Sequence, residues 1–305
     1  MPRSLYFQRL QIIILLACYT PIFIYFSGTI GLLCRGEVYN TMNILFSWSG
    51  DLFNLGPAIY AVINNHPNRH ISFYITTTHP ERVPDYVKHF DERPIRNVKF
   101  YVESYETNQL GFSKIHFGFP SDTYIRLVFP NSHPELERFL YLDGDALVTN
   151  NIEEMYFYNF KNRSAVVVRD ISNPCEGFND YFNGGVILFN NWKYIREKML
   201  EQAVSYLKWL SANKKSFYND QTALNKVFEK SKVMFPVDYN LYHLKNFTNA
   251  TKIVHFYAAP CKPYKPFCCH DNPPYRIWKC LYDAYIMKPY IWKANRTTAI
   301  CTDKN

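Results

Sequence analysis

Hydrophobic and polar residues follow two repeating patterns between residues 43 and 256. Short runs rich in β-branched and aromatic side chains predict strands, and apolar side chains at helical spacing predict helices between them. The predicted strands are 43–47, 71–77, 98–102, 139–142, 165–168, 186–189 and 253–256, and the predicted helices are 55–64, 122–129, 191–210 and 220–230. This alternation predicts an α/β fold, with a mostly parallel sheet and helices on both faces. Ligands bind such sheets at the carboxyl ends of the strands.

The amino-terminal region has a different pattern. Residues 10–33 include no charged side chain, and a helix of that length could cross a hydrocarbon core of about 30 Å. Arg3 and Arg9 precede the segment, which favours a cytoplasmic amino terminus. A cleaved signal peptide and a buried core helix are the alternatives. The predicted division is a cytoplasmic tail at 1–9, a transmembrane anchor at 10–33, a short stem at 34–42, a catalytic domain at 43–263 and an extension rich in cysteine and aromatic residues at 264–305.

Cysteines and glycosylation sequons agree with that topology. Six of the eight cysteines lie beyond the predicted stem, and five of these follow residue 260. No Cys-x-x-Cys pair occurs, which disfavours a zinc ribbon and favours at least one disulfide among the cysteines of 261–301. Sequons begin at Asn162, Asn246, Asn249 and Asn295. Together these features predict a single-pass type II membrane protein of the secretory pathway, with its body in the lumen of the Golgi or endoplasmic reticulum.

The composition limits the class of protein without naming a function. The chain has 305 residues, of which 48% are hydrophobic and 18% aromatic, so it can bury a sizeable core and is neither disordered nor a coiled coil. The formal net charge is +8, but the basic residues form no run or stripe, which disfavours a nucleic-acid partner. A basic balance suits an anionic diphosphate ligand or an acidic membrane surface.

Two carboxylates follow the predicted strand 139–142, in the segment Asp143-Gly144-Asp145. Alternate residues of an extended chain point to the same side, so both carboxylates could bind one cation. Carboxylate oxygens suit hard divalent cations such as Mg²⁺ or Mn²⁺, which commonly also bind substrate phosphates. Gly144 leaves the backbone between the acids open to a ligand. The alternative is an ordinary strand-to-turn junction, because Asp-Gly is common in turns.

Six segments, in order, resemble glycosyltransferase family 8, whose members are retaining enzymes of the GT-A fold that use nucleotide sugars. The matching segments are 43–47, 122–127 with Arg126, 140–148, Tyr181-Phe-Asn-Gly-Gly-Val-Ile-Leu-Phe-Asn190, Asn219-Asp-Gln-Thr-Ala-Leu-Asn225, and Ile253-Val-His-Phe256 with Lys262-Pro263. They span almost the whole predicted catalytic domain. The resemblance therefore implies a GT-A, Rossmann-like sheet, here with an amino-terminal transmembrane helix.

The resemblance also implies a role for each matching residue. The metal ligands would be Asp143, Asp145 and His255, around Mn²⁺ or Mg²⁺. The UDP-sugar donor would contact Ser47, Asp51, Arg126, Gly144, Gly184, Gly185 and Lys262. Lys262 would bind its diphosphate. The catalytic residues would be Asn183, Asp220 and Gln221, beside the donor sugar and its anomeric carbon.

Several of these residues have a structural alternative. His255 could be an ordinary buried histidine, Asp220 a helix N-cap, and Asn183 with Gly184 a hairpin turn. The chain also departs from the family pattern. Relatives often carry an acidic pair near the first strand, where this chain has Ser49-Gly50-Asp51, and Lys262 comes one residue later than usual.

The predicted function is transfer of a hexose, glucose or galactose, from a UDP-sugar to a glycan or glycoconjugate acceptor, with Mn²⁺ and with retention of anomeric configuration. No carboxylate is an obvious covalent nucleophile, so front-face displacement is favoured over the two-carboxylate arrangement of retaining glycosidases. Gln221 would position or stabilise the reacting groups. The alternative is a non-catalytic, membrane-anchored relative that binds a sugar nucleotide or a glycan.

Overall fold

The computed structural model describes residues 41–106, 121–171, 178–213, 219–257, 262–264 and 272–287. The chain divides into two compact units, Met1–Thr41 and Met42–Asn305. The described residues belong to the second unit, apart from Thr41, which begins the first strand.

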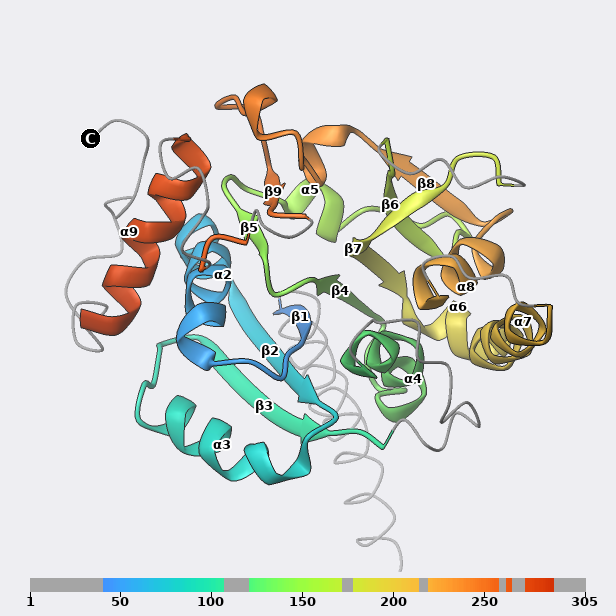
Figure 1. Ribbon diagram of the computed structural model, residues 1–305, viewed down its shortest axis with the longest axis horizontal. Helices are drawn as coiled ribbons and strands as arrows, with labels where there is room; N and C mark the ends of the chain where they lie inside the picture. Colours follow the sequence, from blue (N-terminus) through green and yellow to red (C-terminus); the bar gives the residue numbers. More distant parts are fainter. Residues whose placement is uncertain are drawn as a thin grey trace, which may run out of the picture. The chain divides into compact units, whose positions relative to one another are not determined.

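A seven-stranded sheet forms the centre of the described unit, with the strand order β3-β2-β1-β4-β7-β6-β8 (Figure 1). The strands are β1 (Thr41–Ser47), β2 (His70–Thr77), β3 (Val98–Ser104), β4 (Arg138–Leu142), β6 (Ala165–Arg169), β7 (Phe182–Asn190) and β8 (Lys232–Phe235). β1 is parallel to β4, β2 to β3 and β6 to β8, whereas β7 is antiparallel to both β4 and β6. The mostly parallel α/β sheet predicted from the sequence is therefore confirmed.

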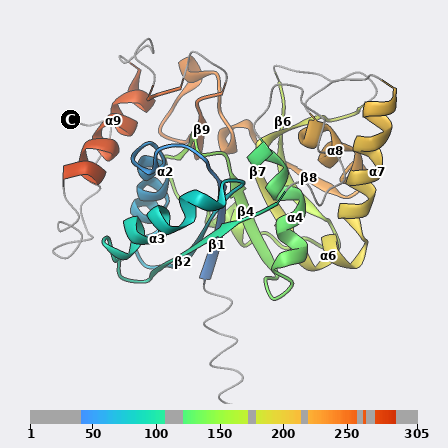
Figure 2. The same cartoon turned by 60° about the horizontal axis from the view of Figure 1, so that its bottom comes forward.

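Side chains alternate between the two faces of the sheet, and a separate set of helices covers each face. Leu140 and Leu142 of β4 join one hydrophobic cluster, whereas Phe139 and Tyr141 join the other. The first cluster includes α2 (Leu52–Asn65), α3 (Val83–Asp91), α5 (Glu153–Tyr156) and α9 (Pro273–Met287), and the second includes α4 (Ile125–Ser132), α6 (Asn191–Arg196), α7 (Met199–Ala212) and α8 (Asn219–Val227). Figure 2 shows α2, α3 and α9 on one side of β4 and α4, α6, α7 and α8 on the other. Burial on both faces explains why the strands are nearly continuous apolar runs.

Most predicted elements lie where the sequence pattern placed them, but some differ. The predicted helix 191–210 is two helices, because Lys198 between α6 and α7 has a left-handed φ of 52°, which an α-helix cannot contain. β7 begins at Phe182 instead of Val186. The prediction missed α3, α5, β8 and α9, together with β5 (Ala146–Val148).

A second sheet has two strands and carries the predicted last strand. β9 (Ile253–His255) pairs with β5 in antiparallel fashion, and Ala146 lies opposite His255. The strand predicted at 253–256 is confirmed, but it lies outside the main sheet. The pairing brings the end of β9 next to the turn that leaves β4.

The described residues do not bear out the membrane part of the predicted fold class. In the ranges that the structure describes, no helix is long and apolar enough to cross a bilayer. The longest of the extension's described elements, α9, has 15 residues, which extend about 22 Å at the usual helical rise, short of a hydrocarbon core of about 30 Å. The anchor predicted at 10–33 lies outside the described residues.

The described part of the carboxy-terminal extension packs into the core. α9 lies alongside α2 (Figure 1), and Tyr275, Trp278 and Tyr285 are buried in its contact. The Tyr285 ring packs edge-on against Tyr60 at a centroid distance of 4.8 Å. Cys280 in α9 is disulfide-bonded, which confirms the prediction of at least one disulfide among the cysteines of 261–301. These aromatic side chains therefore pack in the core of the described unit.

We expect Tyr285→Ala to lower the free energy of unfolding by about 3–5 kcal/mol, the usual cost of deleting a buried aromatic ring. Tyr285 is 2% exposed, whereas the next residue, Ile286, is 42% exposed. Ile286→Ala is therefore a matched control that should cost no more than about 0.5 kcal/mol. Denaturant unfolding of both variants measures the difference. Equal, small losses would show that α9 contributes little to the core.

Candidate active site

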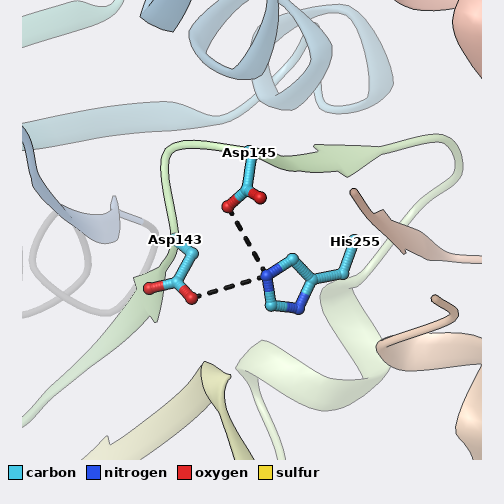
Figure 3. Close-up of side chains that lie close together, drawn as sticks. All are labelled: Asp143, Asp145 and His255. Atoms are coloured by element: carbon cyan, nitrogen blue, oxygen red, sulfur yellow. Dashed lines mark ion pairs between the residues drawn. The ribbon is translucent and has the colours of Figure 1, made fainter. Parts of the chain in front are cut away.

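Two acids and a histidine from separate elements lie together at one edge of the sheet (Figure 3). Asp143 follows β4, Asp145 precedes β5, and His255 ends β9. His255 Nε2 lies 3.4 Å from Asp143 Oδ2 and 3.5 Å from Asp145 Oδ1. One ligand atom from each residue lies within 4.8 Å of the other two, so a single cation could contact all three. We call these residues the triad. The side chain of Asp143 is 30% exposed and the other two are nearly buried, so a ligand would approach past Asp143.

The imidazole of His255 is oriented from its far side. Its Nδ1 lies 2.9 Å from Oδ1 of Asn240, an arrangement that leaves Nε2 directed at the acids. Burial alone would lower the pKa of His255, but attraction to Asp145 and Asp143 raises it to about 9. The same acids would attract a metal cation, and metal binding requires the deprotonated imidazole. A proton on Nε2 and a cation at the triad are therefore alternatives.

Gly185 of β7 has no side chain, and this absence leaves space for the triad. Its carbonyl oxygen accepts a hydrogen bond of 2.8 Å from the backbone N–H of Asp143. A Cβ atom at Gly185 would lie 2.2 Å from Cε1 of His255 and 2.8 Å from Oδ2 of Asp143, distances that real Cβ contacts do not show. The second glycine of the predicted Asn-Gly-Gly segment is thus needed for side chains of two other elements to meet.

A buried arginine connects the triad to α8. Arg126 Nε donates to Asp220 Oδ2 over 2.5 Å, and Nη1 donates to the carbonyl oxygen of Gly184 over 2.5 Å. The same Nη1 lies 3.7 Å from Oδ1 of Asp143. Burial opposes ionisation of Asp143, but His255 and Arg126 outweigh burial and lower its pKa. Arg126 and His255 therefore favour the ionised form of Asp143, whereas burial raises the pKa of Asp220 although Arg126 opposes the shift.

The side chain of Gln221 bridges α8 and β7. Its Oε1 accepts a hydrogen bond of 2.7 Å from the backbone N–H of Gly184, and its Nε2 donates to Asp170 Oδ2 over 3.4 Å. Asp170 also accepts a hydrogen bond of 3.1 Å from the Tyr242 hydroxyl. Since an N–H must be the donor, the bond from Gly184 fixes which end of the Gln221 amide faces the strand.

Asn183, the third predicted catalytic residue, lies in the same buried network. Its Oδ1 accepts from the backbone N–H of Gly185 over 2.9 Å and from Nδ2 of Asn240 over 3.0 Å. Both lone pairs of that oxygen are therefore used, which leaves Nδ2 of Asn183 to bond a ligand. Asn183 is the second residue of β7 and is not part of a hairpin turn, so the turn alternative is wrong.

Lys262 also reaches the triad. Its ammonium group donates to Oδ2 of Asp145, and burial alone would lower its pKa, but Asp145 raises it. Lys262 is therefore partly buried against Asp145 and is not a solvated surface lysine. The predicted diphosphate contact stays a prediction, in which the ammonium would lie beside a metal ligand.

The residues predicted to bind the nucleotide have other partners in this structure. Asp51 caps α2, accepting a hydrogen bond of 2.9 Å from the Phe53 N–H, and Ser47 bonds to Thr76. Gly144 is closely covered: a Cβ atom there would lie 2.3 Å from the ring of Trp48. The backbone of Gly144 is thus packed under Trp48, and its contact with a ligand stays a prediction.

A comparison with protein families agrees with this geometry. The sequence pattern described as glycosyl transferase family 8 matches residues 24–267. The chain belongs to glycosyltransferase family 8. Its assignment from six sequence segments is confirmed, and the chain is a glycosyltransferase by family.

Among similar proteins, a lipopolysaccharide 1,2-glucosyltransferase of Escherichia coli is 25% identical over 77% of this chain and 76% of its own length. A lipopolysaccharide 1,3-galactosyltransferase of Salmonella typhimurium is 25% identical over 70% of this chain and 69% of its own length. The galactosyltransferase LgtC, solved with donor and acceptor sugar analogues, has a TM-score of 0.63 at 20% identity and covers 83% of this chain and 99% of its own. Mouse xyloside xylosyltransferase 1 has a TM-score of 0.55 at 13% identity, over 73% and 99%. These structures confirm the predicted GT-A fold.

The family 8 relatives correct the predicted location. The glucosyltransferase and the galactosyltransferase named above are bacterial lipopolysaccharide enzymes. These relatives do not bear out the prediction of a type II protein of the Golgi or endoplasmic reticulum, and the described residues include no helix that could span a membrane.

Three residues of this family 8 site were not predicted: Trp48, Asp170 and Asn240. Each is a single polar or aromatic residue outside a dense motif, so its position in the chain carries no signal of its own. Asp170 comes two residues after the strand predicted at 165–168. The rule that ligands bind at the carboxyl ends of strands could have drawn attention to it. Asn240 lies in a turn before Leu241, which pairs with Val254, and only that pairing reveals its place beside His255.

We expect Gly185→Ala to weaken Mn²⁺ binding by about tenfold or more, because the added methyl group would push His255 and Asp143 apart. Overpacking of this kind also costs about 1–3 kcal/mol of stability. Isothermal titration calorimetry with Mn²⁺ and thermal unfolding separate the two effects. Unchanged Mn²⁺ affinity in a folded variant would contradict the steric role of Gly185.

Proposed function

We propose that this glycosyltransferase transfers a hexose, glucose or galactose, from a UDP-sugar to a hydroxyl group of a glycan or glycoconjugate acceptor. Mn²⁺ is the preferred metal, and the anomeric configuration is retained. The grouping of Asp143, Asp145 and His255 carries the proposal. Relatives named for glucosyl and galactosyl transfer support the hexose.

The triad suits a divalent cation in its atoms and in its surroundings. It offers two carboxylate oxygens and one imidazole nitrogen, a mixed set that Mn²⁺ accepts, and diphosphate oxygens could complete the shell. Asn240 orients the imidazole, and Gly185 adds no side chain to the space. Once bound, a divalent cation stabilises the negative charge that develops on the diphosphate leaving group.

The residues around the triad divide into a diphosphate side and a sugar side. Lys262 already lies against Asp145, where its ammonium group can turn to a phosphate oxygen. On the other side, Asp220 and Gln221 of α8 and Asn183 of β7 present polar groups from buried positions. Asp220 is held by Arg126, and its carboxylate would accept hydrogen bonds from donor hydroxyl groups. Ser47 and Asp51, at the end of β1, remain the residues proposed for the nucleoside.

The hydrogen bonds of the sugar side favour displacement on the front face. The bond between the anomeric carbon and the phosphate oxygen breaks first, and its electron pair leaves with UDP. The acceptor oxygen then bonds the same face, and its proton passes to the departing phosphate oxygen. Gln221 holds its Oε1 against the N–H of Gly184, so it positions the reacting groups instead of attacking. The carboxylate of Asp220 is likewise engaged with Arg126.

We expect Asp143→Asn and Asp145→Asn each to reduce sugar transfer by at least about 100-fold while the protein stays folded, because an amide is a poor ligand for a divalent cation. Asp85→Asn on the exposed surface of α3 is the matched control and should retain activity. Treatment with EDTA should abolish transfer, and added Mn²⁺ should restore it. Full turnover after EDTA treatment would refute the metal role.

We further expect release of UDP when the purified protein is incubated with UDP-glucose or UDP-galactose, and less release from UDP-xylose, which lacks the CH₂OH group. Loss of one apolar carbon changes specificity by about 10–200-fold, and loss of a hydroxyl that the site hydrogen-bonds changes it by more. Coupled detection of UDP over the panel measures the preference. Tight binding of all three donors without release of UDP would instead identify a non-catalytic sugar-nucleotide-binding protein.

A further inference from the structure

A chain of three hydrogen bonds crosses from β7 to the back of His255. The backbone N–H of Gly185 bonds Oδ1 of Asn183 over 2.9 Å, Nδ2 of Asn240 bonds the same oxygen over 3.0 Å, and Oδ1 of Asn240 bonds Nδ1 of His255 over 2.9 Å. Asn183, Asn240 and His255 are each at most 2% exposed. Water therefore has little access to compete for these bonds, and each must be satisfied within the protein.

The direction of the chain is set at its start. A backbone N–H can only donate, so the side-chain atom of Asn183 that receives it must be the carbonyl oxygen. The atom of Asn240 that faces this oxygen must then be the amide nitrogen, because two carbonyl oxygens would repel each other. The remaining atom of Asn240, its carbonyl oxygen, consequently faces His255.

The end of the chain decides which nitrogen of His255 can bind a metal. A carbonyl oxygen accepts only from an N–H, so Nδ1 of His255 must carry a hydrogen. In the neutral imidazole, the free lone pair is then on Nε2, the atom that lies 3.4 Å and 3.5 Å from the two acids. The backbone of β9 supports this placement, since His255 N–H donates to the carbonyl oxygen of Leu241, the residue after Asn240.

We propose that Asn240 is a positioning residue that holds His255 in the Nδ1–H tautomer and thereby prepares Nε2 as a metal ligand. The inference rests on the proposed function, because it assumes that the triad binds a divalent cation. Partners of metal-bound histidines commonly change metal affinity by about 10–100-fold when they are removed. Between the described residues, no hydrogen bond joins Asn240 to the acids, and its direct contact with the triad is the hydrogen bond to His255.

Two substitutions at Asn240 separate its two hydrogen bonds. Asn240→Leu keeps the size of the side chain and removes both bonds, so Mn²⁺ affinity should fall by about 10–100-fold. Asn240→Asp can still accept from Nδ1 of His255 but places an oxygen against Oδ1 of Asn183, which should lower thermal stability. Mn²⁺ affinity should stay within about threefold of the unaltered chain, since a carboxylate is a common partner of metal-bound histidine. The full chain is titrated with Mn²⁺ by calorimetry, without donor.

Asn191→Leu is the matched control. Asn191 is also fully buried and donates to the carbonyl oxygens of His133 and Leu136 over 2.7 Å and 3.0 Å, but these bonds do not involve the triad. Its loss should lower thermal stability without changing Mn²⁺ affinity. A loss of affinity in this control equal to that of Asn240→Leu would attribute both losses to general destabilisation and overturn the inference.

The outcomes distinguish the inference from the proposed function. If the unaltered chain does not bind Mn²⁺, the proposed function fails. If it binds Mn²⁺ and Asn240→Leu binds equally well, the proposed function stands and the role of Asn240 is refuted. If Asn240→Leu does not fold, Asn240→Asp decides: a tenfold loss of affinity there would show that the hydrogen bond to Nδ1 is not what matters.

Discussion

The pairing of β5 with β9 is the constraint on which the candidate site depends. The acids lie in the short turn between β4 and β5, and His255 comes more than a hundred residues later in the chain. Ala146 lies opposite His255, and the Phe256 N–H donates to the carbonyl oxygen of Asp145 over 3.1 Å. A shift of one residue in this register would turn the imidazole to the other face of the strand. The register of a two-stranded sheet therefore decides whether Nε2 faces the acids or the core.

The reversed direction of β7 explains how one strand serves both sides of the site. Parallel strands place their carboxyl ends at a common edge, and the acids follow β4 at that edge. Because β7 is antiparallel to β4, its amino-terminal residues lie there instead. Asn183 accepts a hydrogen bond from Asn240, the partner of His255. Gly184 is hydrogen-bonded to Arg126 and Gln221, and Gly185 borders the triad. Three successive residues thus join the metal side to the sugar side.

The sequence predicted the main sheet, because apolar strands such as 139–142 and 165–168 are visible as short runs of hydrophobic residues. The strand before Asp143-Gly144-Asp145 pointed to the two acids, although Asp-Gly is also common in turns. His255 was predicted only from the resemblance to family 8, because a single histidine in an apolar strand carries no signal of its own. The same pattern placed the start of β7 four residues too late, at Val186, because Asn and Gly are uncommon within strands. Gly184 and Gly185 lack side chains where Arg126 and His255 occupy the space, which is information from other parts of the chain.

The predicted membrane helix and the missed α9 show the limit of composition as a guide. Tyr275, Trp278 and Tyr285 of α9 belong to the same hydrophobic cluster as α2. Charged residues lie between them in the sequence, so the composition of the segment does not reveal their helical spacing. The place of α9 depends on Gly56, where a Cβ atom would lie 2.3 Å from the Tyr285 ring. A close approach of this kind needs two partners with complementary shapes, and either sequence alone does not identify the other.

The charges around the triad provide a further reason to expect a divalent cation there. Asp143 and Asp145 raise the pKa of His255 and so favour its protonated form. Asp145 also accepts a hydrogen bond from the ammonium group of Lys262. If the imidazole loses its proton and Lys262 turns to a donor diphosphate, two positive charges leave the acids. A divalent cation returns the same charge, so the exchange leaves the buried acids neutralised throughout. Buried carboxylates tolerate the loss of a partner poorly, and this balance allows the site to change occupants without leaving them unpaired. Arg126 takes no part in the exchange, because Asp220 holds it from the opposite side.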